Sequence, residues 1–195
     1  MRPENPKSKQ DILKLAIPLF AKRGFAGVSM RQIAKAVGLN VASLYYHFPD
    51  KQTLYIEAVK QAFSISELDL SNILKMKYSP HKRLRLFVER LCRYFKEQPD
   101  LSALMQREML DGDETRLQLL ATHIFKNFFK EVTSLSKELS SQLNPNMLAI
   151  SILALIVHHY QTIPIRKYLP GVKPTHSDPD VLAEHVISLL LNGLN

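Results

Sequence analysis

Apolar residues recur at every third or fourth position along almost the whole chain, which is the spacing that builds one face of an α-helix. Residues of high β-propensity are scarce by comparison, because the chain has 30 leucines but only 16 valines and threonines together. The sequence therefore predicts an all-α fold of about nine helices. We expect them near residues 8–23, 29–37, 40–47, 51–76, 80–98, 99–111, 114–142, 146–166 and 179–193.

Positive charge is concentrated in the first quarter of the chain. The 195 residues include 26 lysines and arginines against 18 acidic residues, a net charge of +8. Residues 1–55 carry nine basic and three acidic side chains, an excess of +6, whereas the remaining 140 residues carry 17 and 15. A local excess of this size favours an anionic partner for the first part of the chain.

Capping residues divide this basic part into three short helices. Ser29 and Gln32 have the spacing of a capping box, which starts a helix. Gly38 follows the next apolar segment, where a glycine in the left-handed conformation ends a helix. We therefore expect a three-helix N-terminal domain over residues 1–55 and a larger C-terminal helical bundle over residues 56–195.

Several classes of protein are disfavoured by composition and spacing. Cys92 is the single cysteine, which excludes an internal disulfide and fits a reducing cytoplasm. Residues 1–11 are polar and predict no secretory signal, and the longest apolar run, 147–157, is shorter than the ~18–20 residues of a membrane span. Because no nucleophile, base and orienting acid can be assembled, we expect no enzyme. His158 and His159 point about 100° apart on a helix, so we expect no metal site, and no cofactor is predicted.

Residues 29–47 have the layout of a helix-turn-helix, although any helical hairpin shares that layout. The side chains of the second helix favour DNA binding. Its first turn contains Val41, Ala42 and Ser43, which are small and uncharged, so the helix end can approach base edges closely. Val41 and Ala42 suit a thymine methyl group, and Ser43 suits either a donor or an acceptor.

Larger and charged side chains follow this turn. Tyr45, Tyr46 and His47 have polar-tipped rings that suit contacts with DNA phosphates. Lys51 stands in the first turn of the next expected helix, where a cation opposes the helix dipole unless a phosphate binds there. Two further polar residues are expected to face the same DNA backbone, Ser29 and Arg31.

A resemblance to the DNA-binding signature of the TetR family of bacterial transcriptional regulators is carried by residues 24–51, which read GFAGVSMRQIAKAVGLNVASLYYHFPDK. The similarity extends from about residue 9 to 60. It implies a homodimer that binds a palindromic double-stranded DNA operator, and a fourth helix that leads to a ligand-binding domain. By position, the residues implied at or near bases are Arg31, Val41, Ala42, Ser43 and Tyr45. Those implied at phosphates are Ser29, Tyr46, His47 and Lys51.

The helices expected near 146–166 and 179–193 are apolar on nearly every side, so both of their faces need to be buried. The second face is covered either by the rest of the same domain or by a partner subunit. Similarity to the family favours a four-helix interface across a two-fold axis. The residues expected there are Leu153, Ile156, Val157, Leu182, Val186, Leu189 and Leu190.

Aromatic residues of the second domain have two interpretations, a packed core or the wall of a largely apolar effector cavity. Arg107 stands in an apolar stretch beside Glu108, where solvation or a structural ion pair explains these charges as well as ligand contact does. Cys92 is expected to be a small buried hydrophobe, with redox sensing as the alternative. The candidate pocket residues are Phe95, Arg107, Phe125, Phe128, Phe129 and Tyr160.

These observations predict a dimeric repressor that a small-molecule effector releases from DNA, with two recognition helices about one DNA turn apart, ~34 Å. A ligand-independent regulator and an activator are alternatives within the DNA-binding class. A helical protein that binds ligands or partner proteins and keeps a vestigial DNA domain is the alternative from another class. A DNA-binding assay distinguishes the last one from the others.

Overall fold

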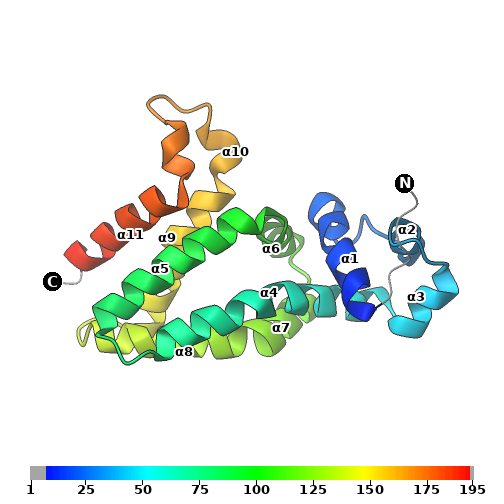
Figure 1. Cartoon of the computed structure of the whole chain (residues 1–195), viewed down its shortest axis with the longest axis horizontal. Coiled ribbons are helices and arrows are strands. Elements are labelled where there is room, and N and C mark those ends of the chain that lie inside the picture. Colours follow the sequence, from blue (N-terminus) through cyan, green and yellow to red (C-terminus); the bar gives the residue numbers. More distant parts are fainter. Residues whose placement is uncertain (1–7, 194–195) are drawn as a thin grey trace. The chain divides into compact units, whose positions relative to one another are not determined.

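The structure, a computed structural model, describes residues 8–193, except for the side chains of residues 64–68 and 193. This part of the chain forms two compact units (Figure 1). Unit 1 contains the residues up to 65 together with residues 103–125, and unit 2 contains residues 66–102 and those from 126 onward. Two of the boundaries fall inside α-helices, at 65/66 and 102/103, and the third falls where a π-helical turn meets an α-helix, at 125/126.

Unit 1 contains the expected three short helices, the start of the fourth helix and the later segment 103–125. Its elements are α1 (Lys9–Arg23), α2 (Met30–Ala36), α3 (Val41–His47), the first part of α4 (Lys51–Lys75), the second part of α6 (Pro99–Asp111), α7 (Glu114–Leu120) and the π-helical turn η1 (Ala121–Phe125). The largest side chains of its core are fully buried: Ile12, Phe20, Ile33, Leu44, Phe48 and Tyr55. Apolar burial of this kind is the main force that holds such short helices together.

Unit 2 is a helical bundle arranged around one helix. Besides the end of α4 and the start of α6, it contains α5 (Pro80–Glu97), α8 (Lys126–Leu139), α9 (Pro145–Gln161), α10 (Ile163–Arg166), the 3₁₀ turn η2 (Pro174–Ser177) and α11 (Pro179–Gly193). Helix α5 packs against α8, α9 and α11 (Figure 1). It has the strongly one-sided pattern of a surface helix, and its apolar face is buried.

The all-α class is confirmed, since all the regular structure among the described residues is helical. Two expected helices are interrupted. Residues 114–142 form α7, η1 and α8, with the Thr122 hydroxyl donating to the Gln118 carbonyl (2.7 Å) at the π-helical turn. Residues 146–166 divide into α9 and α10, because Pro164 has no N–H with which to continue the backbone ladder. Among the described residues, we find no helix with both the length and the hydropathy to cross a membrane.

The compact units differ from the division expected at residues 55 and 56. Tyr55 on α4 is fully buried, and its ring meets those of Phe20 (5.0 Å between centroids) and Phe25 (5.2 Å). Its hydroxyl donates to Glu108 on α6 (2.7 Å). These contacts explain why unit 1 extends along α4 and includes residues 103–125, which lie far away in the sequence.

Candidate nucleic-acid interface

The helix pair α2–α3 begins at a capping box. The Ser29 hydroxyl accepts a hydrogen bond from the Gln32 amide (3.3 Å), and the Gln32 side-chain oxygen accepts one from the Ser29 amide (2.8 Å). Both amides would otherwise lack a partner at this helix start. The predicted box is confirmed, and the Ser29 hydroxyl is therefore engaged within the chain. Arg31 in the first turn is exposed.

The turn between α2 and α3 is determined by its local sequence. Gly38 has a φ of 74°, in the left-handed region that glycine adopts readily. The Leu39 amide donates back to the Ala34 carbonyl (2.9 Å), the bond that closes a glycine-terminated helix. Asn40 then caps α3, since its side-chain oxygen accepts a hydrogen bond from the Ser43 amide (2.7 Å). The expected helix, glycine turn and second helix are all present.

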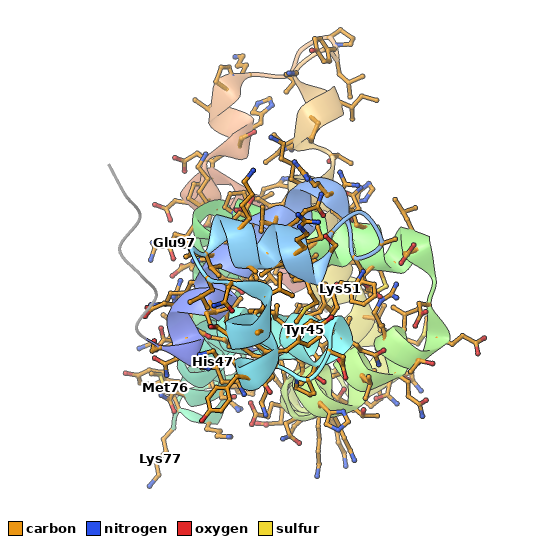
Figure 2. The ribbon with its side chains drawn as sticks, turned by 90° about the vertical axis from the view of Figure 1, so that its right-hand side faces the viewer. Tyr45, His47, Lys51, Met76, Lys77 and Glu97 are labelled. Atoms are coloured by element: carbon orange, nitrogen blue, oxygen red, sulfur yellow. The ribbon has the colours of Figure 1, made fainter. Side chains whose placement is uncertain are left out.

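Helix α3 has one buried and one exposed face. Leu44 and Phe48 are fully buried and anchor the helix in the core of unit 1. Tyr46 is 89 % exposed, Tyr45 is 48 % exposed, and Ala42 is also exposed. The remaining candidates on this helix are half-buried: Val41, Ser43 and His47. Figure 2 looks onto this side of the unit and labels Tyr45, His47 and Lys51.

Lys51 has a folding role that the sequence reasoning missed. Its ammonium donates to the carbonyls of Phe25 and Val28 (2.9 Å each) and lies 4.2 Å from the centroid of the Phe25 ring. Burial, followed by the nearby charge of Arg116, lowers the pKa of Lys51. The loop carbonyls therefore compensate for the cation at this helix start. Its contact with a DNA phosphate stays a prediction, as do the contacts of the other residues assigned to bases and phosphates.

A buried ion pair joins α6 to α7 within unit 1. Glu108 on α6, 2 % exposed, accepts hydrogen bonds from Tyr55 (2.7 Å) and from Nε of Arg116 (2.7 Å). Burial and the hydrogen bond to Glu108 raise the pKa of the Tyr55 hydroxyl. The structural ion pair considered for Glu108 is confirmed. Its partners were missed, because Tyr55 and Arg116 lie 53 and eight residues away in the sequence and no local pattern links them.

The candidate pocket residues are distributed over both units. Phe125 is in unit 1 and meets Phe63 (4.9 Å between centroids), whereas Phe95 stacks on Tyr160 within unit 2 (5.6 Å). The others are placed differently: Phe128 is buried and meets Phe87, Phe129 is half-buried, and Arg107 donates to the Ala21 and Lys22 carbonyls. The assignment of these residues to an effector cavity stays a prediction.

The candidate dimer residues on α9 and α11 are mostly turned into their own unit. Four of them are buried (Ile156, Leu182, Val186 and Leu190), Leu153 and Val157 are half-buried, and Leu189 is 50 % exposed. The exposed apolar side chains of these helices are instead Met147, Ile150, Val181 and Leu189. The assignment of the seven residues to a dimer interface stays a prediction, because helices that are apolar all round do not indicate which face a partner covers.

Cys92 is fully buried on α5, and burial raises the pKa of its thiol to about 12. We expect a thiol reagent at pH 8 to modify the native protein roughly a thousandfold more slowly than the urea-unfolded chain, because only the thiolate reacts. Time courses of labelling with and without urea measure this ratio. Fast labelling of the native protein would instead favour the redox-sensing alternative.

Comparison with known proteins agrees with this geometry. Residues 12–58 match the sequence model of a family described as bacterial regulatory proteins, tetR family. A curated relative is IcaR of Staphylococcus aureus, named as the negative transcriptional regulator of the biofilm operon icaADBC. It is 41 % identical over 68 residues, which are 35 % of this chain and 34 % of the relative. The chain therefore matches about a third of the length of this relative.

Solved structures share the fold over nearly the whole chain. FadR of Bacillus subtilis, solved with stearoyl-CoA, matches with a TM-score of 0.79 and 18 % identity, over 95 % of this chain and 99 % of that one. AibR, solved with isovaleryl coenzyme A and operator DNA, matches with a TM-score of 0.75 and 22 % identity, over 94 % and 97 %. At such identities the likeness concerns the fold alone. The N-terminal helical part of the chain thus matches the tetR family of bacterial regulatory proteins, and the solved structures share the fold of the rest.

Proposed function

We propose that this chain is a DNA-binding transcriptional regulator that acts as a repressor in the cytoplasm. The observation that carries the proposal is the exposed face of α3, which presents Ala42, Tyr45 and Tyr46 beyond a capped glycine turn. The helix is anchored from behind by Leu44 and Phe48, so that a rigid surface meets the DNA. The excess of positive charge in residues 1–55 supports an anionic partner.

The regulator is proposed to work as a homodimer. Met147, Ile150, Val181 and Leu189 leave an apolar surface on α9 and α11 that a second copy would cover. Two copies related by a two-fold axis bind two half-sites of an inverted repeat, with centres about one DNA turn apart. We therefore expect the full chain to select inverted repeats from a pool of random-sequence duplexes.

A small molecule with an apolar part is the proposed effector. The proteins named FadR and AibR were solved with acyl-coenzyme A molecules, which supports an effector of this chemical class. An effector releases DNA only when it binds one conformation more tightly than the other, typically by 1–3 kcal/mol. Stearoyl-CoA and isovaleryl-CoA are the probes to add to the protein–DNA complex, with free coenzyme A as the control.

The test of the proposal is a mobility-shift titration with a duplex selected by the wild-type protein and with a random-sequence duplex. We expect tight, salt-sensitive binding to the selected duplex and weaker binding to the random one. Tyr46→Ala is expected to weaken binding to both duplexes, whereas Ser43→Ala is expected to cost about 1 kcal/mol at the selected site and to change base preference there. Equal affinity for the two duplexes would contradict a specific repressor, and no binding at all would favour the vestigial domain.

A further inference from the structure

The loop between α1 and α2 is held by cations as well as by ring contacts. It runs from Gly24 to Val28 and leads directly into Ser29, the residue that caps α2. At Gly27 the backbone passes so close to Arg23 that an added Cβ would meet the Arg23 carbonyl oxygen at 2.2 Å. The path of this loop therefore sets the point at which the helix-turn-helix begins.

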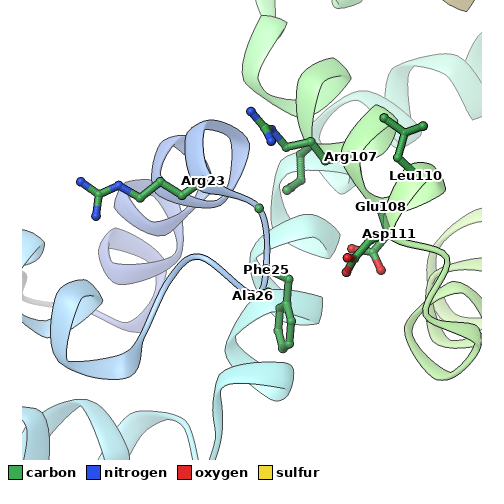
Figure 3. Close-up of a pocket in the computed structure, with 9 residues that line it drawn as sticks. Arg23, Phe25, Ala26, Arg107, Glu108, Leu110 and Asp111 are labelled. Atoms are coloured by element: carbon green, nitrogen blue, oxygen red, sulfur yellow. The ribbon is translucent and has the colours of Figure 1, made fainter.

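Apolar packing does not fill the space between this loop and the end of α6. A cleft of about 300 Å³ lies there, lined by Phe25 and Ala26 on one side and by Leu104, Arg107 and Asp111 on the other. Figure 3 shows Phe25 of the loop across this space from Glu108 and Asp111. Phe25 also meets the rings of Phe20 (6.2 Å between centroids) and Tyr55 (5.2 Å), so these ring contacts and the cations around the ring keep the loop in position beside the cleft.

Two cations lie on the ring of Phe25. Cζ of Arg116 is 4.3 Å from its centroid and Nζ of Lys51 is 4.2 Å from it. Lys51 also donates hydrogen bonds to the carbonyls of Phe25 and Val28, the second and the last residue of this loop. A ring with a cation within about 6 Å of its centroid is attracted electrostatically, and more strongly where water is excluded.

The guanidinium of Arg116 is itself fixed by carboxylates. It pairs with Glu108 (2.7 Å), with Asp111, and with Asp113 (3.3 Å), and its side chain is only 7 % exposed. A planar guanidinium with its donors engaged in this way presents its face to a ring in one orientation. Arg107 adds a second attachment, since it donates to the Ala21 and Lys22 carbonyls at the end of α1.

We propose that Phe25 and Arg116 are positioning residues for DNA binding, through which residues 103–125 hold the loop that starts the helix-turn-helix. Neither residue needs to touch DNA. Arg116 fixes the orientation of the Phe25 ring. The ring and the carbonyls of Phe25 and Val28 bind the Lys51 ammonium, and these contacts together fix the loop that leads into α2. This inference rests on the proposed DNA-binding function, and it assigns part of that function to a segment of the chain that lies outside the helix-turn-helix sequence.

The test compares Phe25→Leu with Phe25→Tyr in the full chain. Leucine keeps an apolar side chain without a π face, whereas tyrosine keeps the face. With the duplex selected by the wild-type protein, we expect Phe25→Leu to bind roughly tenfold more weakly and Phe25→Tyr to bind within about twofold of wild type. Both variants should keep wild-type affinity for a random-sequence duplex, because their basic charges are unchanged.

The matched control is Tyr78→Leu, which removes a cation–π contact of similar length, to Lys82 (4.0 Å), from unit 2. It is expected to leave DNA binding unchanged. The inference is overturned if Phe25→Leu binds the selected duplex as wild type does, or if folded Phe25→Tyr binds as weakly as Phe25→Leu. It is also overturned if Phe25→Leu loses both duplexes equally, which indicates unfolding. Failure of the wild-type protein to bind any duplex removes the proposed function, and this inference with it.

Discussion

Replacing Glu108 with alanine is expected to destabilise the fold by about 3–5 kcal/mol, the typical cost of removing one partner from a buried ion pair. Glu108 is 2 % exposed and accepts hydrogen bonds from Arg116 and from Tyr55 (2.7 Å each). Without this carboxylate, a guanidinium and a hydroxyl are left buried without their main acceptor. Urea-induced unfolding, followed by circular dichroism, measures the loss.

Two further variants show whether burial causes this effect. Glu184→Ala removes a carboxylate that also pairs with an arginine, Arg85 (2.6 Å), but whose side chain is 66 % exposed. It is expected to leave the unfolding midpoint unchanged, since an exposed pair contributes little. Glu108→Gln keeps an acceptor for one partner and should fall between wild type and Glu108→Ala. Equal midpoints for Glu108→Ala and Glu184→Ala would contradict a structural role for the buried pair.

Phe48→Ala and Tyr46→Ala are expected to separate stability from DNA binding within one helical turn. Phe48 is fully buried, so its truncation should cost about 3–5 kcal/mol through lost apolar burial and the cavity that remains. Tyr46 is 89 % exposed, and its truncation should change stability by less than about 0.5 kcal/mol. Thermal unfolding measures the first effect, and a DNA titration well below the melting temperature measures the second.

The two variants are expected to have opposite effects on melting temperature and on DNA affinity. Tyr46→Ala should melt as wild type does and bind DNA weakly, whereas Phe48→Ala should melt early and keep its affinity only where it remains folded. The assignment of Tyr46 to the DNA surface fails if its alanine variant binds DNA normally. The assignment of Phe48 to the core fails if its alanine variant melts as wild type does.

Helices α2 and α3 were predictable from the sequence because the residues that start and end each helix lie close to it in the chain. The Ser29–Gln32 capping box, the left-handed Gly38 and the Asn40 cap each act over three or four residues, and each is present where the sequence predicts it. The buried and exposed faces of α3 follow from helical periodicity in the same way, with Leu44 inside and Tyr46 outside. Such features need no information about the rest of the fold.

The apolar helices of unit 2 were harder to interpret, because periodicity fails when a helix is apolar on all sides. The apolar pattern of α9 and α11 indicated that both faces of each helix are buried. It did not show which residues lie on which face. Val186 is therefore inside the unit, whereas Ile150, left out of the expected interface, is 51 % exposed. The aromatic residues had the same ambiguity, because spacing alone did not show whether Phe125 and Phe128 line a core or a cavity.

Sequence alone determined the helical class, the capped helix-turn-helix and the face of α3 that meets solvent, since short-range hydrogen bonds and the period of the helix are written into neighbouring residues. Only the tertiary structure decided what Lys51 does. Its ammonium is held by the loop carbonyls of Phe25 and Val28 and by a ring that Arg116 also touches. Arg116 lies 65 positions after Lys51 in the sequence and reaches the same ring because unit 1 includes α6 and α7. Helical periodicity relates only residues a few positions apart, so it does not predict a contact across such a separation.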